Sequence, residues 1–263
     1  MTATSEHAYE TSTPTHPIAS KPFTLATDLD GTFLGGDETA RRRLYDWIES
    51  NRRTVGLIFV TGRDPAFIKT LCAEDGVPWP EFVIGDVETT IADVTTDREI
   101  KPIAALEAEI KHLWSDGAER ITMALADASG LTPQETEFRY RLSYHIDVDT
   151  VDRGAVQRVE ALGYDVLLSD DRFFDVLPRG VSKGPSLLRL LAHLGMSTER
   201  VLAAGDTLND LSMLTCGVPA VAVGNSEKAL LAELDGDGRV LQAVDHGAAG
   251  IMEAVSALDL HPV

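Results

Sequence analysis

Short apolar runs alternate with amphipathic stretches over most of the chain. Residues 23–27 and 82–84 are predicted strands, and residues 55–60 form a continuous apolar run typical of a strand covered on both faces. A helix is expected over residues 38–51, with Asp37 as its N-cap. A second helix is expected to open at Asp64-Pro65 and to run to about residue 72.

The same alternation returns after residue 178. Ser182 opens a predicted helix that ends at Gly195. Further strands are expected at 201–204 and 218–223, and helices at 208–215, 226–235 and 248–258. Because short apolar strands alternate with helices, the sequence predicts an α/β fold with a Rossmann-like, doubly wound parallel sheet. The helix that Ser182 opens has an apolar stripe, formed by Leu187, Leu190, Leu191 and Leu194.

The middle of the chain breaks this alternation. Helices are expected at 107–113 and 151–162, and strands at 138–148, 166–169 and 173–177, of which the first alternates like an antiparallel strand. We therefore predict an inserted α+β cap over residues 87–178, and a catalytic core made of residues 22–86 and 179–263. Residues 1–21 are rich in Thr, Ser, Pro and His and are predicted to be a disordered extension.

Charge excludes several classes of partner. The chain has 23 Lys plus Arg and 42 Asp plus Glu, a formal net charge of −19, so we expect no nucleic-acid partner and no membrane partner.

Two cysteines, Cys72 and Cys216, are too few for a disulfide framework. No apolar run approaches the roughly 18 residues of a membrane span, and the N-terminus lacks the pattern of a secretory signal. We expect a cytoplasmic protein.

Two aspartates follow the first predicted strand directly, in the segment Asp28-Leu-Asp30-Gly31-Thr32. Ligands of open parallel sheets bind at the carboxyl ends of the strands, and side chains two residues apart on extended backbone face the same way. Such a pair serves as a nucleophile beside an acid/base group, or as a site for a hard metal ion. An acidic pair that only caps a turn is the structural alternative.

Three further segments stand at strand ends or helix starts on the same predicted edge. Each has an ordinary alternative when taken alone: a threonine at a strand end, a surface lysine, and carboxylates that cap a helix. Together with the aspartate pair they supply metal ligands, a hydroxyl and a cation, which is the set that neutralises and orients a phosphoryl group. The segments are Thr61-Gly62, Lys183, and Gly205-Asp206-Thr207-Leu208-Asn209-Asp210.

The order of these motifs resembles the haloacid dehalogenase superfamily of phosphohydrolases over residues 23–258. The resemblance implies that Asp28 is the nucleophile and Asp30 the general acid/base. It further implies that Mg²⁺ is held by the Asp28 carboxylate, the Asp30 carbonyl and Asp206, with Asp210 in support. For phosphate binding it implies the residues Asp28, Thr61, Gly62, Lys183 and Asn209.

The place of the insert resembles the type IIB cap of sucrose-phosphate phosphatases and Cof-like sugar phosphatases. It implies a small phosphorylated sugar as substrate. Glu88, Arg141 and His145 are candidate substrate contacts in the cap, the last because it alternates with Tyr144 and Ile146 along a predicted strand. Glu88 stands where glycine is usual and Arg141 where lysine is common. Two alternatives stay open: a phosphomutase of the phosphomannomutase type, for which Arg139 and Arg141 would form a second phosphate site, and a non-catalytic phosphosugar-binding protein.

Overall fold

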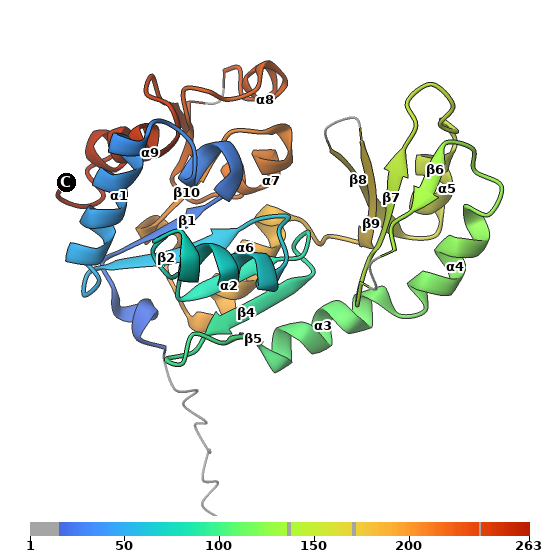
Figure 1. The fold of residues 1–263 in the computed structure, drawn as a ribbon, viewed down its shortest axis with the longest axis horizontal. Helices are drawn as coiled ribbons and strands as arrows, with labels where there is room; N and C mark the ends of the chain where they lie inside the picture. The colour runs from blue at the N-terminus through green and yellow to red at the C-terminus, as the bar shows by residue number, and fades with distance from the viewer. Residues whose placement is uncertain (1–15, 136–137, 170–171, 237) are drawn as a thin grey trace, which may run out of the picture.

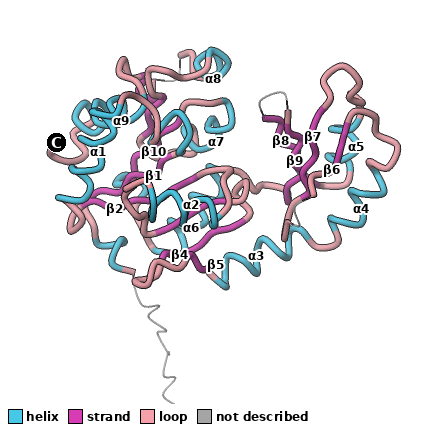
Figure 2. Tube along the Cα trace, in the orientation of Figure 1, coloured by secondary structure: helices cyan, strands magenta, loops and turns pink. Residues whose placement is uncertain are grey.

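A computed structural model describes residues 16–135, 138–169, 172–236 and 238–263. These residues form two β-sheets that lie side by side and are joined by a helix and by a single returning segment (Figure 1). Helices flank both sheets (Figure 2). No helix within the described ranges is both long enough and apolar enough to cross a bilayer.

The large sheet has the strand order β12-β11-β10-β1-β2-β3-β4-β5. Neighbouring strands from β12 to β3 are parallel, whereas β4 and β5 add antiparallel to the β3 edge. The predicted α/β fold with a doubly wound parallel core is therefore confirmed. The strands are β1 Phe23–Thr27, β2 Val55–Val60, β3 Phe82–Gly85, β4 Thr90–Val94, β5 Ile100–Pro102, β10 Val201–Gly205, β11 Ala220–Ala222 and β12 Val240–Gln242.

Helices cover the two faces of this sheet in separate apolar clusters. Alternate residues of β2 divide between them: Leu57 and Phe59 pack with α1, α2 and α9, whereas Ile58 packs with α6, α7 and α8. This division explains why the strand is apolar at every position. The helices are α1 Glu38–Ser50, α2 Pro65–Glu74, α6 Lys183–Leu194, α7 Leu211–Leu214, α8 Lys228–Glu233 and α9 Gly247–Ala257.

The small sheet is antiparallel throughout, in the order β6-β7-β9-β8. Its own apolar core contains Trp114, Tyr144, Phe174 and Val176. The elements are α3 Ala104–Trp114, α4 Gly117–Ala124, β6 Leu131–Pro133, β7 Leu142–Ile146, α5 Ala155–Ala161, β8 Tyr164–Ser169 and β9 Phe173–Pro178. The two-residue segments 136–137 and 170–171 lie outside the described residues.

The change from one sheet to the other does not fall at residue 87, where the sequence suggests it. β4 and β5 extend the large sheet, because β4 pairs antiparallel with β3 from Phe82↔Asp93 to Gly85↔Thr90. The chain leaves that sheet only after Pro102, along α3. Leu106 on α3 packs into the large core, whereas Trp114 at its end packs into the small one. Helix α3 thus belongs to both units.

The start of the described chain also differs from the prediction. Of the extension predicted to be disordered, residues 1–15 lie outside the described residues, but residues 16–21 are ordered, so the prediction is wrong for them. A short 3-10 helix, Pro17–Ser20, buries Ile18 in the core. The Lys21 ammonium donates to the Val55 carbonyl at 3.0 Å and pairs with Glu81. A single buried apolar residue shows no periodicity, so sequence pattern could not reveal this anchor.

Candidate active site

The acidic loop begins where β1 ends. Asp28 follows Thr27 directly, and the chain turns away at Gly31, whose φ is +81°. A Cβ atom at Gly31 would lie 2.1 Å from Oδ2 of Asp206, so only glycine fits there. This turn allows the loop after β1 to approach the loop after β10 closely.

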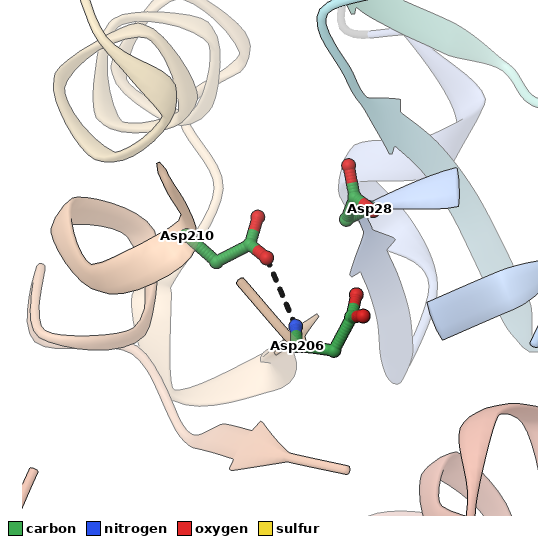
Figure 3. Close-up of side chains that lie close together, drawn as sticks. All are labelled: Asp28, Asp206 and Asp210. Atoms are coloured by element: carbon green, nitrogen blue, oxygen red, sulfur yellow. Dashed lines mark hydrogen bonds between the residues drawn. The ribbon is translucent and has the colours of Figure 1, made fainter. Parts of the chain in front are cut away.

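Three buried carboxylates converge at this edge of the sheet: Asp28, Asp206 and Asp210 (Figure 3). Each offers one oxygen, and these oxygens all lie within 4.8 Å of one another. Asp210 is already engaged, because its Oδ2 accepts from the backbone N–H groups of Asp206 and Thr207, each at 2.9 Å. It therefore shapes the loop, while Asp28 and Asp206 keep oxygen lone pairs for a ligand.

Lys183, the first residue of α6, connects this cluster to the cavity. Its Nζ lies 2.6 Å from Oδ1 of Asp28 and 2.5 Å from Oδ1 of Asp210. Burial alone would lower the pKa of Lys183, but the carboxylates of Asp210 and Asp28 outweigh burial and raise it. The ammonium therefore stays charged, and the third of its N–H groups can donate to a phosphoryl oxygen.

The positive charge of Lys183 does not fully offset the negative charge of the buried carboxylates. Burial raises the pKa of Asp28 to about 7, and the nearby carboxylates of Asp210 and Asp206 act in the same direction, although Lys183 opposes them. Burial likewise raises the pKa of Asp206 to about 6. A cluster of oxygen donors that repel one another is the donor set that suits a hard divalent cation. The residues present thus fit Mg²⁺.

Asp30 lies in a different environment from Asp28. Its side chain is 56% exposed, and Arg63 holds it through two bonds, Nε to Oδ2 at 2.8 Å and a terminal guanidinium nitrogen to Oδ1 at 3.1 Å. The Asp30 carboxylate thus lies at the solvent-exposed side of the site and is not part of the group formed by Asp28, Asp206 and Asp210. Arg63 follows Thr61-Gly62 directly, so the loop after β2 supplies this contact.

A cavity of about 950 Å³ opens from the cluster toward the small sheet. The Asn209 amide donates across it to Ser169 Oγ of β8 at 3.1 Å. Of the sequence-predicted residues, His145 does not line the cavity; it lies at the exposed end of β7 against Phe173. The predicted residues on the cavity wall are Asp28, Asp30, Thr61, Gly62, Glu88, Arg141, Lys183 and Asn209.

The two arginines that the sequence offers as a second phosphate site are both paired with carboxylates. Arg141 lies 3.0 Å from Asp175 and 3.2 Å from Asp86, and Arg139 pairs with Glu107. Their charge is therefore largely offset by the protein itself. This arrangement gives no support to a second phosphate site at Arg139 and Arg141, which the phosphomutase alternative requires.

The sequence pattern assigned no role to two side chains, Thr32 and Asn225, that hold the Asp206 carboxylate in place. Thr32 Oγ1 donates to Oδ1 of Asp206 at 2.5 Å. The Asn225 amide donates to the Gly31 carbonyl at 3.0 Å and to Oδ2 of Asp206 at 3.4 Å, and its oxygen accepts from Gly247 N–H at 2.8 Å. The only signal for Asn225 was its place after the apolar run 218–223, at the same sheet edge as the other motifs.

A family model described as sucrose-6F-phosphate phosphohydrolase matches residues 21–259. The chain belongs to this family. It is a phosphatase of the sucrose-phosphatase type within the haloacid dehalogenase superfamily. The family assignment agrees with the resemblance that the order of the sequence motifs indicates.

Relatives in sequence differ in length. The chain is 38% identical over 231 residues to a glucosylglycerol-phosphate synthase of Pseudomonas anguilliseptica; the match covers 88% of this chain but 30% of that protein. It is 28% identical over 249 residues to a mannosylfructose-phosphate phosphatase of Agrobacterium fabrum, covering 90% of this chain and 97% of the relative. The chain thus corresponds to the whole of one relative and to less than a third of the other.

Solved structures share the fold. The sucrose-phosphatase of Synechocystis sp. PCC6803, determined with sucrose and phosphate, has a TM-score of 0.79 at 24% identity, covering 91% of this chain and 98% of that one. A sugar phosphatase of subclass IIB has a TM-score of 0.64 at 14% identity, covering 91% and 100%. At these identities the likeness shows the fold alone.

Proposed function

We propose that the protein is a Mg²⁺-dependent phosphatase that removes phosphate from a small glycoside phosphate through an aspartyl-phosphate intermediate. The observation that carries the proposal is the Lys183 ammonium between Asp28 and Asp210 at the end of the cavity, with Asp206 at the same point. A nucleophile, a buried cation and free carboxylate oxygens together match the needs of phosphoryl transfer.

Asp28 and Asp206 would hold the metal ion through their carboxylates, and Asp30 through its main-chain carbonyl. When bound, Mg²⁺ supplies positive charge that offsets the charge of the phosphoryl oxygens. Asp210 supports the site indirectly, because its own oxygens are bonded to Lys183 and to the loop after β10.

In the first step an Asp28 oxygen attacks phosphorus, and the bond from phosphorus to the alcohol oxygen breaks. Asp30 gives its proton to that oxygen, which leaves as the free alcohol. In the second step water attacks phosphorus, Asp30 accepts a proton from the water, and the bond from phosphorus to Asp28 breaks. Inorganic phosphate leaves and Asp28 is restored. Phosphoryl oxygens are bound by Lys183, Thr61, Gly62 and Asn209.

The names of the relatives support a glycoside phosphate as substrate. Sucrose phosphate, mannosylfructose phosphate and glucosylglycerol phosphate each consist of a hexose linked to a second, polyhydroxylated unit. A cavity of about 950 Å³ lies at the upper end of the range for small-molecule sites, so a two-unit ligand has room. The substrate class therefore agrees with the size of the cavity.

Phosphate release across a panel of esters tests the proposal. We expect turnover of sucrose 6-phosphate, mannosylfructose phosphate or glucosylglycerol phosphate at a higher kcat/KM than glucose 6-phosphate. Activity should require Mg²⁺ and vanish in excess EDTA, and Ca²⁺ should inhibit, because its looser coordination misplaces the nucleophile. Full activity in EDTA would contradict the metal assignment, and isomerisation that depends on a sugar bisphosphate would indicate a mutase instead.

A further inference from the structure

The turn between β3 and β4 has an unusual backbone. Asp86, Val87 and Glu88 have φ values of +60°, +50° and +63°, a left-handed conformation that is costly for residues other than glycine and most of all for a β-branched one. Strain of this kind persists only where the surroundings impose it, and it gathers at ligand sites. The turn is therefore a place to look for a function.

Contacts with two neighbouring segments impose this conformation. The N–H of Asp86 donates to the Arg63 carbonyl at 2.8 Å, and the N–H of Val87 donates to the Gly62 carbonyl at 3.3 Å. Ser186 Oγ on α6 donates to the Glu88 carbonyl at 3.2 Å. The turn is thus fixed between the loop that follows β2 and the helix that begins with Lys183.

The Glu88 side chain enters the cavity from this turn. The residue is 2% exposed and lines the cavity wall. Among the described residues no side chain donates to its carboxylate or pairs with it, and its oxygens are not among the fully enclosed unpaired polar atoms, so they face the cavity. The Lys183 ammonium, which acts on Glu88 electrostatically, donates its hydrogen bonds to Asp28 and Asp210 instead. A buried carboxyl group without a protein partner is costly unless a ligand or water in the cavity completes it.

Glu88 shares the cavity wall with Lys183 and with Arg141 and Asp175. Lys183 and Asp210 act on it electrostatically from the phosphoryl end, and Asp175 and Arg141 act on it from the cap end. Burial also raises the pKa of Glu88 to about 7, so near neutral pH its carboxyl group can accept a hydrogen bond or donate one.

We propose that Glu88 binds a hydroxyl group of the alcohol from which phosphate is removed, and thereby selects polyhydroxylated esters over apolar ones. This inference rests on the proposed function and assigns to it a specificity residue outside the four motifs. A site built to bond a hydroxyl rejects an analogue that lacks it, because the buried polar group is then left unpaired. Glu88 comes from the core sheet, so part of the selectivity does not depend on the cap.

The test compares two variants on two kinds of ester. Glu88→Gly removes the carboxyl group and relieves the left-handed backbone, so it should fold with a melting temperature no lower than that of the wild type. Its kcat/KM should fall about 10–100-fold more on sucrose 6-phosphate and glucosylglycerol phosphate than on phenyl phosphate, which carries no hydroxyl group. Glu88→Gln keeps a donor and an acceptor and should restore most of this selectivity.

The matched control is Arg98→Gly. Arg98 has a φ of +61° in the turn between β4 and β5 and does not line the cavity. It should leave the ratio of the two kcat/KM values at the wild-type level.

Three outcomes would count against these ideas in different ways. If Glu88→Gly lowered kcat/KM by the same factor on both kinds of ester, or left it unchanged on both, Glu88 would not be a specificity residue. The proposed function would stand in either case. If Glu88→Gln lost selectivity as fully as Glu88→Gly, hydrogen bonding would be the wrong explanation. If the wild type hydrolysed phenyl phosphate but none of the hydroxylated esters, the proposed substrate class would be wrong, and the role of Glu88 with it.

Discussion

Two aspartates that are two residues apart in the sequence have opposite surroundings in this site. Asp28 is buried and bonded to Lys183, whereas Asp30 is more than half exposed and bonded to Arg63. A nucleophile needs a fixed position against phosphorus, and an acid/base group needs access to the leaving oxygen and to water. The geometry therefore favours the division of roles that the sequence resemblance implies.

Substitution of each aspartate separates these roles. A sugar alkoxide needs a proton as it leaves, so Asp30→Asn should slow the first step on a sugar phosphate by roughly 10²–10⁴-fold. With p-nitrophenyl phosphate the same variant should form the aspartyl-phosphate but hydrolyse it slowly, giving a burst of nitrophenol in stopped-flow measurements. Asp28→Asn should abolish both burst and turnover, because an amide is a poor nucleophile. Equal losses on both substrates without a burst would argue against the division.

Asn225 should affect the affinity for metal rather than the chemistry. Its amide orients the Asp206 carboxylate and the Gly31 carbonyl, so Asn225→Ala should weaken Mg²⁺ binding by about 10–100-fold. Isothermal titration calorimetry of the metal-free protein measures this effect without turnover. Asn51→Ala is the matched control, since among the described residues the Asn51 amide bonds within its own helix end, to the Trp47 carbonyl at 2.8 Å. Equal Mg²⁺ affinity in both variants would mean that Asn225 does not position the ligand.

Glu88 should make the stability of the protein dependent on pH. Its pKa is about 7 in the folded state against an ordinary value of 4.5, so the folded state binds the proton more tightly. Relative to Glu88→Gln, the wild type should therefore lose stability as pH rises from 4.5 to 7. The loss should reach at most about 3 kcal/mol above pH 7 and disappear below pH 4.5.

Urea denaturation at several pH values in EDTA measures this difference. Glu233→Gln, at an exposed position of α8, is the control for the substitution itself. A difference between wild type and Glu88→Gln that stayed constant over this range would show that the carboxyl group titrates normally.

At the scale of elements, local signals predicted the parallel core well. The side chains of Asp37 and Asp64 cap α1 and α2 as expected, through bonds of 2.8 Å and 2.9 Å to the third residue beyond each cap. Gly195 ends α6 with a φ of +64°. These features depend on residues within one helical turn, so they are visible in the sequence. The continuous apolar run of β2 likewise reports its own burial.

Elements defined by a partner were not predictable in the same way. β4, β5 and β12 are short strands that exist because another strand pairs with them, and β6 pairs only with β7. The site shows the same limit. Its motifs follow from position on the sheet edge, but the bonds from Thr32 and Asn225 to Asp206 join loops after different strands, and the direction of the Glu88 side chain depends on the strained turn.

At the scale of the molecule, helix α3 connects the two units. Leu106 and Ile110 pack into the large core, and Glu109 pairs with Arg189 of α6 at 2.7 Å. Its last residue, Trp114, packs into the small core. The helix therefore completes the large unit as well as leading out of it, and we expect only residues 115–177 to be separable.

Two excisions distinguish this division from the boundary at residue 87. Removal of residues 87–178 takes away β4, β5 and α3, and with them Ile91, Leu106 and Ile110 of the large core, so this variant should not fold to a cooperative unit in thermal melts. Replacement of residues 115–177 by a short Gly/Ser linker is feasible because the two ends lie close together: Tyr164 donates to the Trp114 carbonyl at 3.1 Å and is paired with Pro178. That variant keeps the metal cluster, Lys183 and Glu88, and it should melt cooperatively.

The smaller excision should change selectivity in a particular way. Hydrolysis of phenyl phosphate should persist at a reduced rate, because water is no longer excluded from the site. Discrimination among sucrose, mannosylfructose and glucosylglycerol phosphates should disappear, since the cap wall that faces the remote sugar is gone. The preference for a hydroxylated ester over phenyl phosphate should survive in part, because Glu88 stays in the core sheet. Measured kcat/KM ratios that kept the full discrimination among the three glycosides would show that the cap does not select the substrate.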